Sequence, residues 1–242
     1  MRARYVFKAY RARYLRQRGE LRTVAATLRP DDLAVDIGAH KGTYTYWMRR
    51  AVGPAGRVVS FEPQPRLAAY LRSVTALMGW RNVDVRQYAL TDVPGTAVLH
   101  VPGKSGMSLS ASLDSATYVA DAGFHYECAV DTLDRQMRGT GRVALVKVDV
   151  EGHELQVFRG AEGLLKRDAP ALLFECEARH LRRHSMRDVF GYLEGLGYEG
   201  AFFAPVELRP LDEFDPAVHQ REGGAGTGRV PYCNNFLFTP RR

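Results

Sequence analysis

Short runs of β-branched and aliphatic residues alternate with amphipathic helical segments along most of the chain, from Leu33 onward. The runs expected to form strands are Leu33–Ile37, Val58–Phe61, Val83–Tyr88, Val143–Val148, Ala171–Phe174, Tyr198–Phe203 and Tyr232–Thr239. Strands that alternate with helices pair in parallel, because each helix carries the chain back to the start of the next strand. The pattern therefore predicts an α/β fold with a mostly parallel seven-stranded sheet and helices on both faces.

Two segments interrupt this alternation. The first, His100–His125, is rich in Ser, Gly and Ala and lies between the strand-like runs Thr96–Val101 and Tyr126–Val130. The second, Leu208–Pro231, contains four glycines. Ligands of such sheets bind beyond the carboxyl ends of the strands, so loops that leave those ends are expected to form the walls of a binding site. Disordered excursions are the alternative interpretation.

Basic residues are concentrated at the N-terminus. Of the 34 Lys and Arg residues, eight lie within residues 1–22, together with one of the 27 acidic residues, so the remaining chain has 26 of each and is formally neutral. Phe7, Tyr10, Tyr14 and Leu21 fall near one face of a helix. We expect residues 1–22 to form a basic amphipathic helical extension that docks through these side chains on a single domain, residues 23–242. There are three alternatives for this segment: it contacts an anionic membrane surface, it contacts RNA, or it is a transit peptide.

Composition limits the remaining possibilities. The longest apolar runs, such as Ala169–Phe174, are much shorter than a membrane span, and the first residues alternate Arg with aromatic residues instead of forming an apolar signal core. A cytoplasmic protein is therefore expected. The three cysteines are widely spaced and form no CxxC pair, so we expect neither a disulfide framework nor a zinc site.

The segment VDIGAHKG indicates what the sheet binds. It places Asp36 in the first predicted strand, and Gly38 and Gly42 in the turn that follows. This spacing matches neither the GxGxxG fingerprint nor the GxxxxGK[ST] phosphate loop. It resembles the D-x-G-x-G-x-G turn of S-adenosylmethionine-dependent methyltransferases, with His40 in place of the middle glycine. Glu62, at the end of the second strand, is placed to accept hydrogen bonds from the ribose hydroxyls of an adenosine.

Titratable residues near the ends of later strands, three acids and one histidine, are candidates for a general base. The four candidates, all expected near strand ends, are Asp149, Glu151, His153 and Glu175. A surface or helix-capping role is the alternative for His153. For Glu175, and for Glu177 beside it, the alternative is a solvent-facing position or an ion pair with Arg179 or Arg182. Asp149, Glu151 and Glu175 together have the ligand chemistry for Mg²⁺, but a metal site is not the favoured interpretation.

Several segments together resemble one family, the FkbM-type methyltransferases. They are DIGAHKG, SFEPQP, ALTDVPGTAVLHV, VDTLD, VKVDVEGHELQVFRGA and NNFLF, and the resemblance extends over roughly Leu33 to Pro240. It implies a Rossmann-like class I methyltransferase fold for residues 23–242, with S-adenosylmethionine as cofactor. The family motif positions in this chain are Asp36, Gly38, Ala39, Gly42, Glu62, Asp149, Glu151, Gly152 and Glu154. The residues that we expect to bind the cofactor are Asp36, Gly38, Ala39, His40, Gly42, Glu62, Ala89 and Asp149. The family commonly has Asn where His40 stands.

The resemblance implies that the acceptor is a hydroxyl on a small molecule, either a saccharide or a secondary metabolite. The chain contains no N/D-P-P-Y/F motif and no Pro-Cys nucleophile, which favours oxygen as the methyl acceptor. One alternative is an RNA-directed methyltransferase that uses the N-terminal arginines. The others are a non-catalytic nucleotide-binding module and an oxidoreductase, although the missing GxGxxG motif disfavours the last of these.

Overall fold

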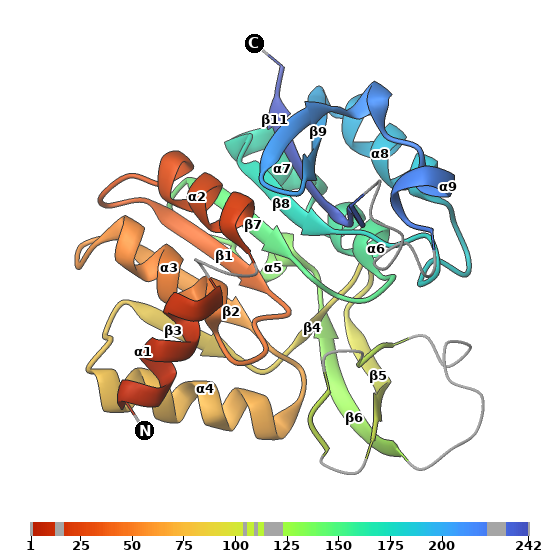
Figure 1. Cartoon of the computed structure of the whole chain (residues 1–242). Helices are drawn as coiled ribbons and strands as arrows, with labels where there is room; N and C mark the ends of the chain where they lie inside the picture. Colours follow the sequence, from red (N-terminus) through yellow and green to blue (C-terminus); the bar gives the residue numbers. More distant parts are fainter. Residues whose placement is uncertain are drawn as a thin grey trace.

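The computed structural model of the chain describes residues 2–12, 17–103, 106–108, 111–113, 123–221 and 231–241. Within these residues the strands form one large and one small sheet (Figure 1). The large sheet has eight strands in the spatial order β10 (Glu207–Pro210), β9 (Tyr198–Ala204), β11 (Asn235–Pro240), β8 (Ala171–Glu175), β7 (Val143–Val148), β1 (Leu33–Ile37), β2 (Arg57–Phe61) and β3 (Val83–Arg86). The five strands from β8 to β3 are parallel, and β11, β9 and β10 are antiparallel to their neighbours.

This sheet corrects the predicted one in two respects. All seven predicted strands are present, but the sheet is mixed and has eight strands instead of being mostly parallel with seven. The additional strand, β10, lies partly in the segment Leu208–Pro231 that was expected to be a loop. Every residue of β10 is exposed, so the strand carries no alternation of buried and exposed side chains from which it could be predicted.

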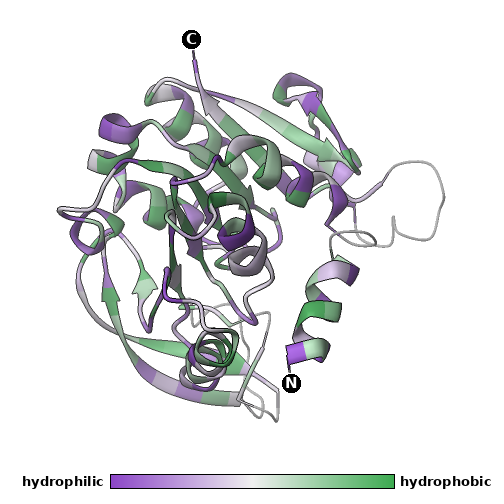
Figure 2. Ribbon diagram, turned by 90° about the vertical axis from the view of Figure 1, so that its left-hand side faces the viewer, coloured by the Kyte–Doolittle hydropathy of each residue, from purple (hydrophilic) through white to green (hydrophobic). Residues whose placement is uncertain are grey.

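Helices cover both faces of the large sheet. One face is covered by α2 (Arg18–Thr27), α3 (Thr43–Val52) and α4 (Pro65–Met78), and the other by α5 (Leu133–Gln136), α6 (Glu154–Arg159), α7 (Glu162–Asp168) and α8 (Met186–Gly195). Successive strand residues point to opposite faces of the sheet. Ala34 therefore packs in the core under α2, α3 and α4, and Val35 in the core under α5 to α8. Hydrophobic residues are concentrated along the strands between these helical layers (Figure 2).

The N-terminal helix α1 (Arg2–Arg11) packs against α3 and α4. Tyr5 and Ala9 are its buried residues, and the Trp47 indole N–H donates to the main-chain oxygen of Ala9 over 3.0 Å. Phe7 was expected to dock with the aromatic stripe, but its side chain is 66% exposed because Tyr5 and Ala9 occupy the buried face. Tyr14 lies outside the described residues. Residue 22, the predicted end of the extension, lies within α2.

A small sheet stands beside the large one. It consists of β4 (Ala89–Leu90), β6 (Gly123–Asp131) and β5 (Gly95–Pro102), with β5 and β6 paired antiparallel. Both strands extend into the segment His100–His125, which was expected to be a loop. Much of that segment lies outside the described residues.

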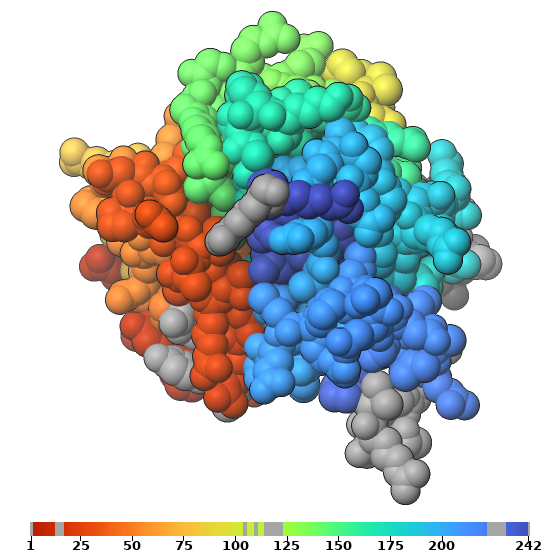
Figure 3. Space-filling model, turned by 90° about the horizontal axis from the view of Figure 1, so that it is seen from above, coloured from red at the N-terminus to blue at the C-terminus, as the bar shows by residue number. Residues whose placement is uncertain are grey.

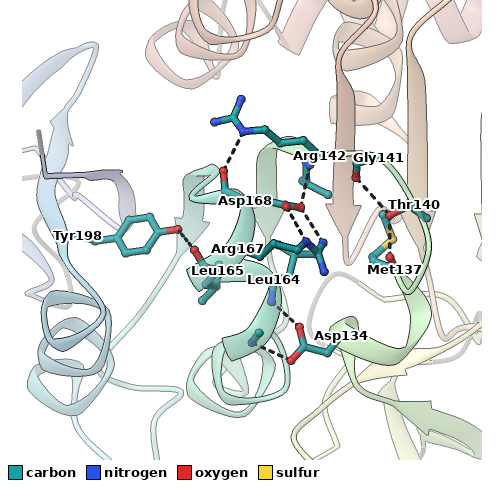
Figure 4. Close-up of polar contacts among 12 residues, drawn as sticks. Asp134, Met137, Thr140, Gly141, Arg142, Leu164, Leu165, Arg167, Asp168 and Tyr198 are labelled. Carbon is teal, nitrogen blue, oxygen red and sulfur yellow. Dashed lines mark hydrogen bonds and ion pairs between the residues drawn. The ribbon is translucent and has the colours of Figure 1, made fainter.

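Polar contacts stabilise the edge of the sheet where the strands begin (Figure 4). The Asp134 carboxylate accepts hydrogen bonds from the N–H groups of Gly163 and Leu164 in the first turn of α7, over 2.9 and 2.7 Å. The Asp168 carboxylate accepts from the N–H of Val143, the first residue of β7, over 3.0 Å. The Asp134 contacts attach α5 to α7, and the Asp168 contact attaches the end of α7 to the start of β7.

Seen from above, the N-terminal segments in red and orange lie on one side of the molecule and the C-terminal segments in blue on the other (Figure 3). The three cysteines are buried and free. Among the described residues, no helix combines the length and the apolar character that crossing a membrane requires.

Candidate active site

A cavity of about 280 Å³ lies beyond the carboxyl ends of β1, β2, β7 and β8, and the small sheet closes its other side through Leu99. Eight of the eleven predicted site residues line it: Gly38, His40, Glu62, Ala89, Asp149, Glu151, His153 and Glu175. Four further polar residues in the wall were not identified from the sequence, namely Gln17, Gln64, Tyr88 and Ser108. The cavity therefore brings together the residues that follow four separate strands.

The turn after β1 passes directly against the end of β7. Gly38 has a φ of +75°, and a Cβ at this position would lie 1.9 Å from the main-chain oxygen of Asp149. The N–H groups of Gly38 and Ala39 both donate to the main-chain oxygen of Phe61, over 3.0 Å each. A glycine is required at position 38 because both the backbone angle and the close approach exclude a side chain.

Glu62 lines the cavity and is 2% exposed. Its two carboxylate oxygens accept hydrogen bonds from the N–H groups of His40, over 2.7 Å, and Gln64, over 2.9 Å. Burial raises the pKa of Glu62 to about 7, although these two hydrogen bonds favour the charged form. Each carboxylate oxygen has a second lone pair, so Glu62 retains the capacity to accept hydrogen bonds from a ligand.

The remaining predicted residues of this turn do not line the cavity. Asp36 is buried behind the turn and accepts a hydrogen bond from the Thr45 hydroxyl over 2.5 Å, and burial raises the pKa of Asp36 to about 6. Gly42 is the N-cap residue directly before α3 and has a φ of +76°, and its main-chain oxygen accepts a hydrogen bond from the Tyr5 hydroxyl over 2.6 Å. Together with Ala39, these residues shape the turn from behind.

A buried lysine, Lys147, lies next to the acidic residues and was not identified from the sequence. Its side chain is 1% exposed, and its Nζ lies 3.5 Å from Oδ2 of Asp149 and 4.9 Å from the centroid of the Tyr44 ring. Its positive charge favours the ionised forms of Glu20 and Glu175. A single lysine within the apolar run VALVKV is the signal that could have identified it.

Glu175 has the most strongly perturbed environment of the four candidate bases. Burial, followed by the negative charge of Asp149, raises the pKa of Glu175 well above its ordinary value. The Asn234 side-chain amide donates to Glu175 over 2.6 Å and to Glu177 over 2.8 Å. Arg179 pairs with Glu177, so the ion pair that was expected for Glu175 or Glu177 is formed by Glu177.

The side chains of Glu151 and His153 have partners on neighbouring segments. Oε2 of Glu151 lies 2.6 Å from Nδ1 of His180, and Glu151 itself has a φ of +53°. Nε2 of His153 lies 3.0 Å from the hydroxyl oxygen of Thr91. In the described part of the chain, no three His, Cys, Asp or Glu side chains are arranged to hold a metal ion.

Comparison with solved structures defines the class of this fold. The FkbM methyltransferase from Methylobacillus flagellatus aligns with a TM-score of 0.52 at 16% identity, over 90% of this chain and 50% of that protein. A Streptococcus mutans protein described as a methyltransferase and solved in complex with SAH aligns with a TM-score of 0.50 at 9% identity, over 91% of this chain and 94% of that protein. The fold is that of the class I methyltransferases.

The family follows from the sequence match. The model of the methyltransferase FkbM domain matches residues 36–199, and the chain belongs to this family, which confirms the resemblance noted from its motifs. The methyltransferase sdnD of Sordaria araneosa is 27% identical over 164 residues, which cover 57% of this chain and 63% of that protein. The chain thus spans less than two thirds of this relative and about half of the Methylobacillus protein.

Proposed function

We propose that the chain transfers a methyl group from S-adenosylmethionine to a hydroxyl oxygen of a small molecule, such as a saccharide or a secondary metabolite. The observation that carries this proposal is the position of Glu62. Its buried carboxylate faces the same cavity as the Gly38 turn and the acidic residues after β7 and β8. Membership in a methyltransferase family favours methyl transfer over an oxidoreductase or a non-catalytic nucleotide-binding module.

The residues present fit an adenosine cofactor. Glu62 is an acceptor-only group when ionised, and it would hold the ribose hydroxyls. The turn at Gly38 and His40 would border the cofactor on the adjacent side of the cavity. Burial lowers the pKa of the His40 ring to about 4, so this ring is neutral at physiological pH and adds no positive charge beside a cationic cofactor.

S-adenosylmethionine, when bound, supplies an activated methyl group on a positively charged sulfur. The chain then needs to orient the acceptor hydroxyl and to remove one proton from it. Orientation is the larger contribution, because well-aligned intramolecular reactions gain up to about 7–11 kcal/mol. A general base adds roughly 10²–10⁴ in rate.

Glu175 is the base that we propose among the four candidates. Burial and the neighbouring Asp149 raise its pKa and therefore its affinity for a proton. The Asp149 carboxylate is already engaged in an ion pair with Lys147, whose Nζ lies 3.5 Å away. Glu151 and His153 are held by His180 and Thr91.

The test is calorimetric titration of the full chain with S-adenosylmethionine and S-adenosylhomocysteine. The Glu62→Ala variant should bind both at least tenfold more weakly, because a hydrogen bond to a charged group contributes about 1.5–3 kcal/mol. Glu194→Ala is the matched control, since this acid is exposed on α8 and does not line the cavity. Unchanged affinity in a folded Glu62→Ala variant would exclude the ribose contact, and no binding by the unmodified chain would exclude the cofactor.

The exposed basic residues of α1 support one alternative acceptor, an RNA. Arg2, Arg4, Lys8 and Arg11 are exposed, and none of them forms an ion pair with an acid among the described residues. An RNA acceptor predicts binding that weakens steeply with salt and is lost when Arg4 and Lys8 are replaced by Ala. Methylation of a small hydroxyl compound that is unaffected by these substitutions would exclude the alternative.

A further inference from the structure

A second, smaller cavity of about 60 Å³ adjoins the main one. The two cavities share Leu113 and His153 in their walls, so the second opens beside the candidate bases. Its volume is several times the roughly 10–15 Å³ that one water molecule needs. A group with several heavy atoms therefore fits there.

The two cavities differ in the charge of their walls. Carboxylates line the main cavity, at Asp149, Glu151 and Glu175 among others. The smaller cavity is lined by the basic side chains Arg182 and Arg183 and by two histidines, and no carboxylate belongs to its described wall. His153 belongs to both walls, so the acidic wall of the main cavity and the basic wall of the smaller cavity meet at this residue.

The connection between β8 and α8 brings the basic residues to this position. A Cβ at Gly152 would lie 2.4 Å from the main-chain oxygen of His180, so the connection can lie against the turn after β7 only because position 152 is a glycine. The His180 ring is held by Glu151 over 2.6 Å. At the other end, Ser185 and Asp188 form a capping box that fixes the start of α8.

Two buried polar atoms at this cavity have no hydrogen-bond partner among the described residues. They are Nε2 of His184 and Oε1 of Gln156, and both residues line the wall. Buried polar groups in proteins are normally hydrogen-bonded, so these two indicate that a polar ligand completes the site. The Gln156 amide can rotate to present its NH₂ group, which makes it a donor beside Arg182 and His184.

We propose that the smaller cavity binds an anionic group of the methyl acceptor, a phosphate or a carboxylate. The guanidinium of Arg182 would provide the charge and His184 a further N–H donor. Bound in this way, the acceptor would extend past His153 and place its hydroxyl among the acids of the main cavity. This inference rests on the proposed function, and it narrows the acceptor to a hydroxyl compound that carries an anionic substituent.

The first experiment titrates inorganic phosphate into the full chain and follows the imidazole signals of His184 and His153 by NMR. We expect both signals to shift, and the affinity to fall at least tenfold in Arg182→Ala and His184→Ala. The matched control is Arg187→Ala, an exposed arginine on α8 that does not line the cavity and should bind phosphate as the unmodified chain does. Absence of any shift, or equal affinity in all variants, would overturn the anion site.

A second experiment compares glucose with glucose 6-phosphate as probes of acceptor binding. Tighter binding of the phosphorylated sugar, lost in Arg182→Ala, is the expected result. Equal binding of the two sugars by a chain that binds phosphate would overturn the assignment to the acceptor. Binding of S-adenosylmethionine is measured in parallel by calorimetry. If the chain binds this cofactor but does not bind phosphate at the smaller cavity, only this inference is contradicted. If it binds phosphate but not the cofactor, the proposed function is contradicted.

Discussion

The hydroxyl of Tyr5 donates a hydrogen bond to the main-chain oxygen of Gly42 over 2.6 Å, between residues that are 37 positions apart in the sequence. Tyr5 belongs to α1, and Gly42 is the residue before α3, at the end of the turn that borders the main cavity. A Cβ at position 42 would lie 2.9 Å from the Tyr5 oxygen, so the two groups are in close contact. The N-terminal helix therefore supports the cofactor turn from behind.

Replacing Tyr5 with Phe should weaken binding of S-adenosylmethionine by roughly 2- to 10-fold, since an intramolecular hydrogen bond contributes about 0.5–1.5 kcal/mol. Calorimetric titration measures this change. The control is Phe7→Ala on the same helix, where the side chain is 66% exposed and should not affect the turn. Equal affinities in Tyr5→Phe and the unmodified chain would show that α1 does not support the turn.

Replacing Lys147 with Met should reduce the free energy of unfolding by about 3–5 kcal/mol, because the substitution leaves buried acids without their positive neighbour. Glu20 is one of them: burial raises its pKa, and the charge of Lys147 opposes that shift. The double variant with Glu20→Gln should recover part of the loss. Urea denaturation measures the change, with the exposed Lys166→Met as control. If Lys147→Met and Lys166→Met lose the same small amount of unfolding free energy, the buried acids do not depend on Lys147.

Replacing Glu154 with Gln should flatten the dependence of stability on pH. Burial raises the pKa of Glu154 in the folded chain to about 7, so the folded state holds a proton that the unfolded state releases above pH 4.5. The free energy of unfolding therefore falls as the pH rises from about 4.5 to 7, by roughly 1–3 kcal/mol for this group. Urea denaturation at pH 5 and pH 8 should show a smaller loss in Glu154→Gln than in the exposed control Glu194→Gln. Identical losses would contradict the raised pKa.

Replacing Glu175 with Gln should lower kcat by roughly 10²–10⁴ without changing the affinity for S-adenosylmethionine. In the unmodified chain, kcat/KM should rise with pH through a pKa well above that of an ordinary carboxyl, because the base acts when it is deprotonated. Asn234→Ala removes a donor to the Glu175 carboxylate and should move this limb to still higher pH. If the Glu175→Gln variant keeps its activity, Glu175 is not the base, and Asp149 becomes the candidate.

Much of the fold was predictable because its signals are local. The parallel strands β1, β2, β7 and β8 each consist of a short apolar run between turn residues, and the periodicity of the intervening helices predicts parallel pairing. The carboxyl ends of parallel strands meet at one edge of the sheet. For this reason Gly38, Glu62 and Asp149, which follow or end different strands, were correctly expected to lie near one another.

The sequence by itself thus determined the α/β class, the positions of the main strands along the chain and the edge of the sheet at which the cavity lies. The tertiary structure alone decided that Tyr5 supports Gly42, that Lys147 is buried among acids, and that Arg182 and His184 reach the turn at Gly152. These relationships join segments far apart in the chain, and their geometry depends on how helices and connections pack. Local periodicity specifies which face of an element is apolar, but it carries no information about which distant residue meets that face.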